Sequence, residues 1–261
     1  MQKIIGTSNI NSVKYYACGY CMNNLHFVFK KYPKEIRKFP AGVFLIEHRE
    51  KGYILVDTGY AVDMFDKGII PKLYKLFNPT FCNEEDEIAN QLKKEGISSD
   101  MIKHIILTHL HPDHIGCLGK FKNAKFYISE ELYDEYKKRN LKSLIFESLI
   151  PEDFEERLQF IKFPSSSNET EIFKNVSVIK LDGHAKGQIG VFMKNENILL
   201  AADSCWGKDL LESSKRMKIT GKLIQNNVEE YKQTIDILEK LQKEKVNIYF
   251  SHDKIDRKEL L

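Results

Sequence analysis

The sequence is poor in the features that mark several protein classes. Its five cysteines are an odd number at irregular spacing, so a disulfide framework is not expected. No apolar run approaches the roughly 18 to 20 residues of a membrane span, and the first residues lack the apolar stretch of a secretory signal. The 40 basic and 37 acidic residues nearly balance and are mixed along the chain. We therefore expect a cytoplasmic protein with neither a nucleic-acid nor a membrane partner.

The chain is long enough and apolar enough for a substantial core. It has 261 residues, of which 42% are hydrophobic. No internal repeat occurs at the periods typical of solenoids, and no composition shift suggests a linker. We therefore expect residues 1–261 to form one domain.

Strand and helix signals recur along the chain. An apolar hairpin is expected over 42–48 and 53–57, and residues 83–96 are typical of an amphipathic helix. Further strands are expected at 104–108, 125–129, 176–181, 190–194, 198–202 and 246–250, with helices at 130–139 and 228–243. Residues 60–81 are expected to form an aromatic surface flap, and 140–168 a variable segment. This pattern predicts two sheets packed face to face with helices outside.

The most informative feature is the run Thr-His-Leu-His-Pro-Asp-His-Ile-Gly at residues 108–116. His109 and His111 lie two apart on an extended segment and can point the same way. Asp113 and His114 follow after Pro112 has turned the chain. Imidazole and carboxylate groups at this density suit divalent transition metals, so one loop can serve two neighbouring cation sites.

Three later strands deliver similar side chains at their ends. His184, Asp203 and His252 each follow an apolar run, and Asp57 ends an earlier strand beside a glycine turn. Together they predict a site that collects side chains from many strand ends. The remaining histidines, His26, His48 and His104, are interpreted as bystanders.

The cysteines are not needed for this chemistry. Cys18 and Cys21 form a C-x-x-C pair with only His26 nearby, which favours ordinary packing over a redox or accessory metal role. Cys205 lies two residues after Asp203, and we interpret it as a packing residue.

With these residues in place, the sequence resembles the metallo-β-lactamase superfamily of binuclear hydrolases over almost its whole length. The resemblance implies an α/β fold, the four-layer αββα sandwich, with the site at the edge between the sheets. It implies that His109, His111 and His184 hold one metal, that Asp113, His114 and His252 hold the other, and that Asp203 bridges them. Asp113 and Asp203 would then act in catalysis, while Asp57 would orient a ligand histidine.

Two divalent ions in such a site make a hydrolytic mechanism the natural one. They lower the pKa of a shared water, so that a bridging hydroxide is available to attack an ester at neutral pH. Zn²⁺ suits the predicted ligands best, and iron or manganese also accept them.

Within the superfamily, the chain is most similar to the N-acyl homoserine lactonase branch, which implies an ester or lactone of a small acyl substrate. Those lactonases carry a tyrosine three residues after the bridging aspartate, whereas this chain has Trp206, which either contacts substrate or anchors the core. A phosphodiesterase is the alternative, favoured by four basic residues after Asp203: Lys208, Lys215, Arg216 and Lys218. The apolar segments 60–81 and 140–168 fit an acyl or aromatic small-molecule substrate, and fit a homodimer interface equally well.

Overall fold

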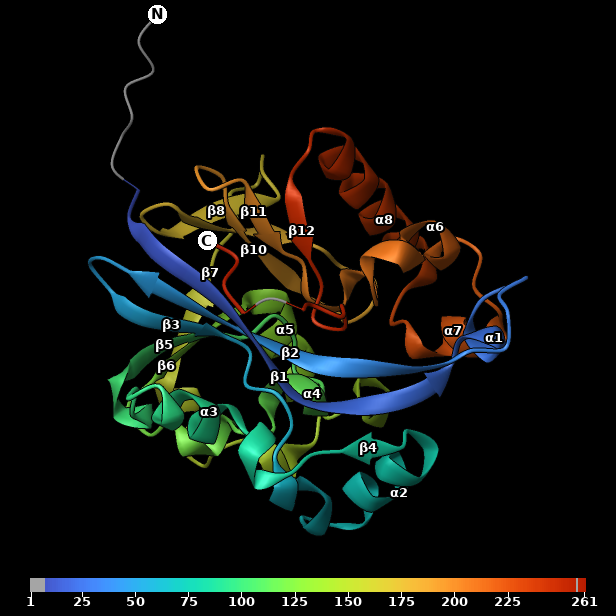
Figure 1. Ribbon diagram of the computed structural model, residues 1–261, viewed down its shortest axis with the longest axis horizontal. Coiled ribbons are helices and arrows are strands. Elements are labelled where there is room, and N and C mark those ends of the chain that lie inside the picture. Colours follow the sequence, from blue (N-terminus) through green and yellow to red (C-terminus); the bar gives the residue numbers. More distant parts are fainter. Residues whose placement is uncertain (1–7, 257) are drawn as a thin grey trace, which may run out of the picture.

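The computed structural model describes residues 8–256 and 258–261, which form two β-sheets with helices on their outer faces (Figure 1). The larger sheet has the strand order β4-β1-β2-β3-β5-β6-β7. Its strands, in chain order, are β1 (Ile10–Asn24), β2 (Ile36–His48), β3 (Gly52–Val56), β4 (Thr80–Phe81), β5 (Ile102–Ile106), β6 (Lys125–Ser129) and β7 (Leu158–Ile161).

The smaller sheet has the order β12-β11-β10-β9-β8. Its strands are β8 (Glu169–Phe173), β9 (Val176–Lys180), β10 (Ile189–Met193), β11 (Ile198–Leu200) and β12 (Asn247–Tyr249). The helices are α1 (Leu25–Val28), α2 (Ile69–Phe77), α3 (Ile88–Lys94), α4 (Pro112–Ile115), α5 (Glu130–Lys137), α6 (Leu211–Ser214), α7 (Ile219–Ile224) and α8 (Val228–Lys243).

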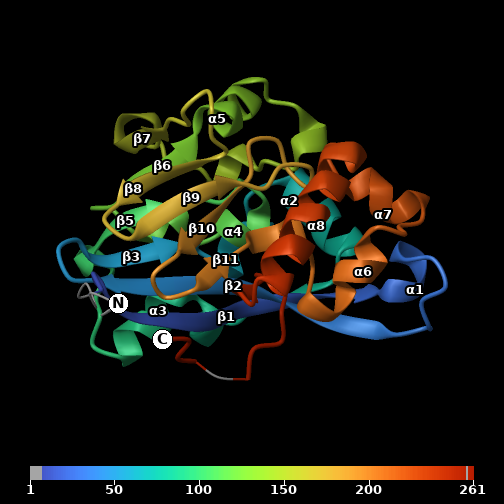
Figure 2. The ribbon, with the colours of Figure 1, turned by 90° about the horizontal axis from the view of Figure 1, so that it is seen from above.

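Figure 2 shows the layers from above. Three apolar clusters hold them together. Between the sheets, Phe44 and Val56 of the larger sheet share one cluster with Val178 and Val191 of the smaller sheet. A second cluster lies between the larger sheet and the helices α3 and α5, and a third packs α8 against the smaller sheet. The result is the predicted αββα sandwich.

Parallel pairing determines where the chemistry can gather. β3, β5, β6 and β7 are successive parallel neighbours, and β11 pairs in parallel with β12. The carboxyl ends of parallel strands meet at one edge of a sheet. The residues that follow β3 and β5 therefore lie at one edge, and those that follow β11 and β12 lie at another.

Most predicted elements are confirmed, and the helix at 228–243 is correct at both ends. The hairpin is also confirmed, although β2 begins six residues earlier than position 42, at Ile36. Four strands were missed: β1, β4, β7 and β8. β1 and β8 contain many polar residues, and β7 lies in the segment expected to be irregular, so an apolar-run criterion cannot find them.

The prediction of a surface flap over residues 60–81 is wrong for its first half. Tyr60 and Phe65 are buried in the core cluster beneath α3. The large exposed apolar side chains lie mainly in the second half, which forms α2 followed by β4. The helix expected at 83–96 is also interrupted, because Glu87 takes an extended conformation between a short 3-10 turn and α3.

No helix in the described part of the chain is long and apolar enough to cross a bilayer. All five cysteines are free thiols. Cys205 packs in the cluster beneath α8, as interpreted from the sequence. Cys18 and Cys21 are likewise buried, each in a core cluster.

Candidate functional site

The structure brings all seven predicted ligand residues together at the edge between the sheets. They form two groups whose candidate ligand atoms lie within 4.8 Å of one another in each group. The first group is His109, His111 and His184, and the second is Asp113, His114, Asp203 and His252. Every member is buried. Side chains up to 143 positions apart therefore converge, since His109 and His252 both take part.

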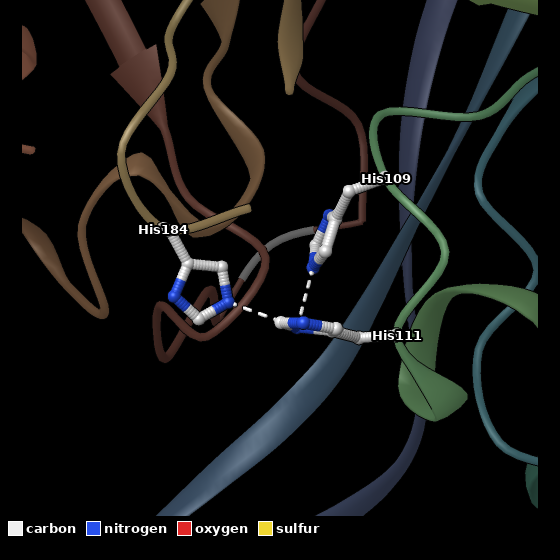
Figure 3. Close-up of side chains that lie close together, drawn as sticks. All are labelled: His109, His111 and His184. Atoms are coloured by element: carbon white, nitrogen blue, oxygen red, sulfur yellow. Dashed lines mark hydrogen bonds between the residues drawn. The ribbon is translucent and has the colours of Figure 1, made fainter. Parts of the chain in front are cut away.

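The first group is an array of imidazoles that face one another (Figure 3). His109 Nε2 and His184 Nε2 each lie 3.0 Å from His111 Nδ1. The outer nitrogens of His109 and His184 have their own partners, Thr108 Oγ1 at 3.1 Å and Gln225 Oε1 at 3.0 Å.

These outer contacts assign the tautomers from the hydrogen-bond network. Gln225 Oε1 can only accept, so His184 Nδ1 carries the proton and its Nε2 lone pair points inward. Thr108 Oγ1 donates to Asp57 and accepts from His109 Nδ1, which turns the His109 Nε2 lone pair inward as well. A proton on His111 Nδ1 can be donated to only one of these two lone pairs, so the other remains without a hydrogen-bond donor. The donor set therefore fits a cation at its centre.

The second group is built around Asp203. Its Oδ2 lies 2.8 Å from His252 Nε2, and its Oδ1 lies 3.2 Å from His114 Nε2. Asp113 Oδ2 completes the group at 3.5 Å from His252 Nε2. Asp203 also reaches the first group, because its Oδ2 lies 3.5 Å from His184 Nε2. It is thus the residue placed between the two groups.

Two buried atoms of this group have no hydrogen-bond partner among the described residues: His114 Nε2 and Asp203 Oδ1. Although they lie 3.2 Å apart, the geometry between them is not that of a hydrogen bond. Leaving buried polar atoms unpaired is costly unless something else binds them. A second cation, with these atoms as ligands, fits this group.

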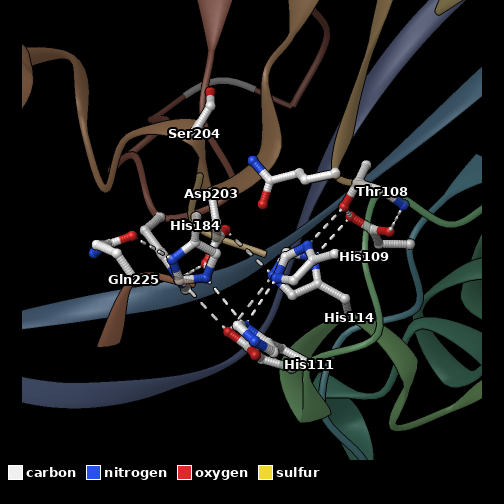
Figure 4. Close-up of polar contacts among 12 residues, drawn as sticks. Thr108, His109, His111, His114, His184, Asp203, Ser204 and Gln225 are labelled. Carbon is white, nitrogen blue, oxygen red and sulfur yellow. Dashed lines mark hydrogen bonds and ion pairs between the residues drawn. The ribbon is translucent and has the colours of Figure 1, made fainter. Parts of the chain in front are cut away.

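Asp57 binds the outer nitrogen of His114, on the other side of the ring from the nitrogen that faces Asp203. The polar contacts around Thr108, His114 and Asp203 are drawn in Figure 4. The Asp57 carboxylate accepts the Thr108 N–H at 2.9 Å, the Thr108 hydroxyl at 2.8 Å and His114 Nδ1–H at 2.7 Å. Asp57 has a φ of 64°, a left-handed conformation that aspartate and asparagine tolerate better than most residues. The sharp turn after β3 therefore aims a buried carboxylate at the histidine loop.

Close packing holds the histidine loop against the turn after β3. Pro112 occupies the first helical position of α4, where its missing N–H is harmless. Thr58 donates both its N–H, at 2.7 Å, and its hydroxyl, at 3.0 Å, to the carbonyl of His114. A Cβ on Gly116 would lie 2.6 Å from the Gly59 carbonyl oxygen, so the chain segments touch only because residue 116 is glycine.

Gln225 is a site residue that the sequence did not reveal. It follows α7 and is buried, and its side chain accepts from His184 Nδ1 and donates to the Gly221 carbonyl at 3.3 Å. The main chain of this segment is tied to the His184 turn as well, since Asn226 N–H donates to the His184 carbonyl. No local pattern marks a lone glutamine 41 residues from its partner.

The protein's own groups give the two clusters different electrostatic characters. Burial lowers the pKa of His109 and His111 well below the usual range, and it lowers that of His184. Burial has the same tendency at His252, but Asp203 outweighs it and raises the pKa to about 9. Burial would raise the pKa of Asp203, yet His252 and His114 hold it well below the usual range. The first cluster thus offers neutral imidazoles and the second offers carboxylate charge.

The site forms the floor of a largely apolar cavity of about 490 Å³. Five of the seven clustered residues reach its surface: His111, Asp113, His184, Asp203 and His252. Its walls come mainly from α2, with further residues from β1 and the loop at 144–146 and single residues from α1 and α7. Tyr74 and Asn78 are among the few polar side chains. Trp206 also lines the cavity, with its ring edge-on to His184 at 6.0 Å between centroids.

The three other histidines lie outside both clusters. His26 contacts the Tyr32 carbonyl, and His48 contacts the Lys174 carbonyl. His104 packs on Phe173 with ring centroids 5.0 Å apart. His104 Nδ1 also lies 3.0 Å from the Tyr127 hydroxyl, so the described contacts of all three are with main chain, aromatic rings and one phenol.

Comparison with known proteins supports this geometry. Residues 37–252 match the metallo-beta-lactamase superfamily. The chain is 27% identical to an N-acyl homoserine lactonase of Bacillus thuringiensis over 233 residues, which cover 85% of this chain and 84% of the relative. It is 26% identical to an N-acyl homoserine lactonase of Bacillus cereus over 235 residues, with the same coverage.

The fold comparison agrees. A solved N-acyl homoserine lactone hydrolase with N-hexanoyl-L-homoserine bound at its catalytic metal centre superimposes with a TM-score of 0.74, 25% identity and 95% coverage of both chains. A solved quorum-quenching N-acyl homoserine lactone lactonase gives a TM-score of 0.73 and 25% identity, with 95% of this chain and 94% of that chain covered. The sandwich, the two clusters and the match over most of the sequence have one common explanation: this chain belongs to the metallo-β-lactamase superfamily and is distantly related to the N-acyl homoserine lactonases.

Proposed function

We propose that this chain is a binuclear metal-dependent hydrolase that cleaves the ester bond of a small acyl substrate, with a lactone as the first choice. The observation that carries the proposal is the placement of two metal-binding clusters, joined by Asp203, on the floor of an apolar cavity. The relatives described above are named as lactonases, and their similarity to this chain supports the choice of lactone.

In this proposal His109, His111 and His184 hold one ion, and Asp113, His114 and His252 hold the other, with Asp203 shared. When bound, two divalent ions lower the pKa of a shared water and polarise an ester carbonyl. Imidazole and carboxylate donors suit Zn²⁺, with iron or manganese as alternatives.

The surrounding residues hold the ligands ready for this chemistry. Asp57, Gln225 and the Pro40 carbonyl, which lies 2.7 Å from His252 Nδ1, each keep the proton on the outer nitrogen of one histidine. Asp113 and Asp203 bring carboxylate charge to the cavity floor, where it faces the reacting bond. Because these side chains are buried and tied to the main chain, little reorganisation is needed when substrate arrives.

The cavity favours an acyl group over a polar substrate. Ile70, Leu73 and Phe77 of α2 line it together with Val28 of α1 and Ile224 of α7. An apolar chain placed between them would leave its ester at the clusters below.

We assign to Trp206 a role in contacting substrate, because it lines the cavity beside His184. It is 8% exposed, its ring packs on Phe29, and it lines the cavity, so it contacts both the core and the space for substrate. An indole N–H can donate one hydrogen bond to a substrate oxygen but cannot accept one.

The phosphodiesterase alternative loses its sequence support. None of the four basic residues after Asp203 lines the described cavity. Lys215 pairs with Asp236 and Glu239, and Arg216 pairs with Glu212. These charges serve surface contacts rather than a phosphate at the site.

Three substrates test the proposal: an N-acyl lactone, an aryl ester and bis(p-nitrophenyl) phosphate. We expect the zinc-loaded protein, carrying two equivalents of metal, to hydrolyse the lactone fastest, and Asp203→Ala to lose this activity. Two bound equivalents with no turnover of any substrate would refute the catalytic proposal. Preference for the phosphate diester would replace it with the alternative.

A further inference from the structure

An exposed apolar surface borders the cavity, since Phe77 lines the cavity and is 81% exposed. Among the described residues, seven large apolar side chains are at least 63% exposed, and six of them lie on α1, α2 and α7. We call these six the apolar rim: Phe27, Ile69, Leu76, Phe77, Ile219 and Leu223. Scattered exposed apolar residues are normal, whereas a gathering of this kind marks an interaction surface.

The rim is continuous with the cavity. α1 and α7 are joined by hydrogen bonds, including Lys218 N–H to the Val28 carbonyl at 2.8 Å, and they lie together at one end of the molecule in Figure 1 and Figure 2. Leu73 of α2 and Ile224 of α7 both line the cavity, and Phe77 belongs both to its lining and to the rim. The helices that carry the rim therefore also line the cavity that a substrate must enter.

The charges within the rim have one sign. α2 and α7 carry no acidic residue, and their only charged side chain positions inside the helices are Lys72, Lys75 and Lys222. Lys218 precedes α7, and Lys30 follows α1. Among the described residues, none of these five lysines has a carboxylate partner.

The acids near the rim are mostly neutralised by their own neighbours. Asp63 pairs with Lys67, and Glu35 pairs with Arg37. Asp66, just before α2, is the exception in having no ion pair within the described residues. The rim is therefore an apolar surface flanked by lysines without carboxylate partners among the described residues.

We propose that the rim docks on an anionic lipid surface, so that the cavity opens directly onto a lipid phase. Short helices with exposed Ile, Leu and Phe beside lysines are suited to the boundary between acyl chains and headgroups. The lysine stems can extend along the apolar face while their ammonium groups reach anionic headgroups.

The charge of the rim favours an anionic lipid surface over a second copy of the chain as its partner. A symmetric dimer through the rim would bring the same lysines face to face, and like charges oppose association. An anionic surface instead satisfies them. The proposal departs from the expectation of no membrane partner, which depended on the lack of a spanning segment and on the overall charge balance, neither of which reports on a local peripheral surface.

Sedimentation of the zinc-loaded protein with vesicles tests the proposal. We expect binding to vesicles of phosphatidylcholine mixed with phosphatidylglycerol, much weaker binding to phosphatidylcholine alone, and loss of binding as salt is raised. Lys72→Gln with Lys222→Gln should weaken binding about 25-fold, since each lysine near such a surface contributes about fivefold. Lys103→Gln with Lys122→Gln is the matched charge control and should leave binding unchanged.

Leu76→Ser with Leu223→Ser removes apolar anchors that do not line the cavity, and it should abolish vesicle binding. Met101→Ser, at an exposed apolar position outside the rim, is its control. Absence of wild-type binding to the anionic vesicles would overturn the proposal, as would undiminished binding by the leucine variant. A dimer seen by equilibrium sedimentation and dissolved by these same leucine changes would assign the rim to a second copy instead. Hydrolysis of a short, water-soluble substrate should persist in the leucine variant, so this result and failure of the proposed function remain distinct.

Discussion

Replacing Asp57 by asparagine tests how the protein prepares His114 for a metal. The substitution keeps the shape of the side chain, and asparagine tolerates the positive φ of this turn. The amide oxygen can still accept the Thr108 N–H, but the amide nitrogen then takes the place of Oδ2, which accepts from Thr108 Oγ1 and His114 Nδ1. Since an NH₂ group cannot accept, His114 would have to move its proton to Nε2, the atom directed at Asp203.

That proton would occupy the lone pair needed by a cation. Loss of such a supporting carboxylate typically weakens metal binding 10- to 100-fold, or about 1.4 to 2.8 kcal/mol. We expect this loss at one of two sites, with the first cluster largely unaffected.

Competition with a chromophoric chelator measures both dissociation constants. Asp86→Asn is the matched control, because Asp86 also accepts a backbone N–H, that of Asn83 at 2.8 Å, but lies outside both clusters. Thermal unfolding of the metal-free variants would check that the fold is intact. Two unchanged dissociation constants in a folded Asp57→Asn protein would refute the tautomer reasoning.

Four further outcomes are expected. Asp203→Ala should abolish hydrolysis and reduce occupancy of both sites by metal analysis, and full activity would disprove the shared-ligand assignment. Trp206→Phe should alter the ratio of kcat/KM values between substrates with metal content unchanged; an unaltered ratio would make it a core anchor only. Gln225→Leu removes the acceptor of the His184 proton and should weaken zinc binding about tenfold, measured by chelator competition. Free zinc at about 1,000 times its dissociation constant should raise Tm by about 8–16 °C, because such binding contributes about 4 kcal/mol, and an unchanged Tm would exclude zinc from the folded site.

The ligands could be predicted from sequence because their signal is local. His109, His111 and His114 lie within six residues, and His184 and His252 each follow an apolar strand. A strand end is recognisable from periodicity alone. Within each sheet, strands that run in the same direction then bring their ends to one edge, and the packing of the two sheets brings these edges together. Even so, the convergence itself was a prediction that only the fold could test.

The supporting residues could not be predicted in this way. Gln225 acts on His184 because the segment after α7 folds back onto the turn after β9, and that contact is tertiary. β1 was missed for the related reason that its pairing with β2 and β4 compensates for a weak strand pattern. The exposure of α2 was invisible as well, because its apolar sequence is equally typical of a buried helix.

The position of the site between two sheets gives the ligands a structural role beyond chemistry. A Cβ on Gly42 of β2 would lie 2.4 Å from the Ser251 carbonyl oxygen, so glycine allows the segment before His252 to approach the larger sheet. There His252 donates to Pro40 of the same strand, while its other nitrogen faces Asp203 from the smaller sheet. Cations held by both groups would therefore join ligands that follow β5 to ligands that follow β9, β11 and β12. Metal binding and the packing of the two sheets should consequently be coupled, which is why the predicted rise in Tm concerns the whole fold and not one loop.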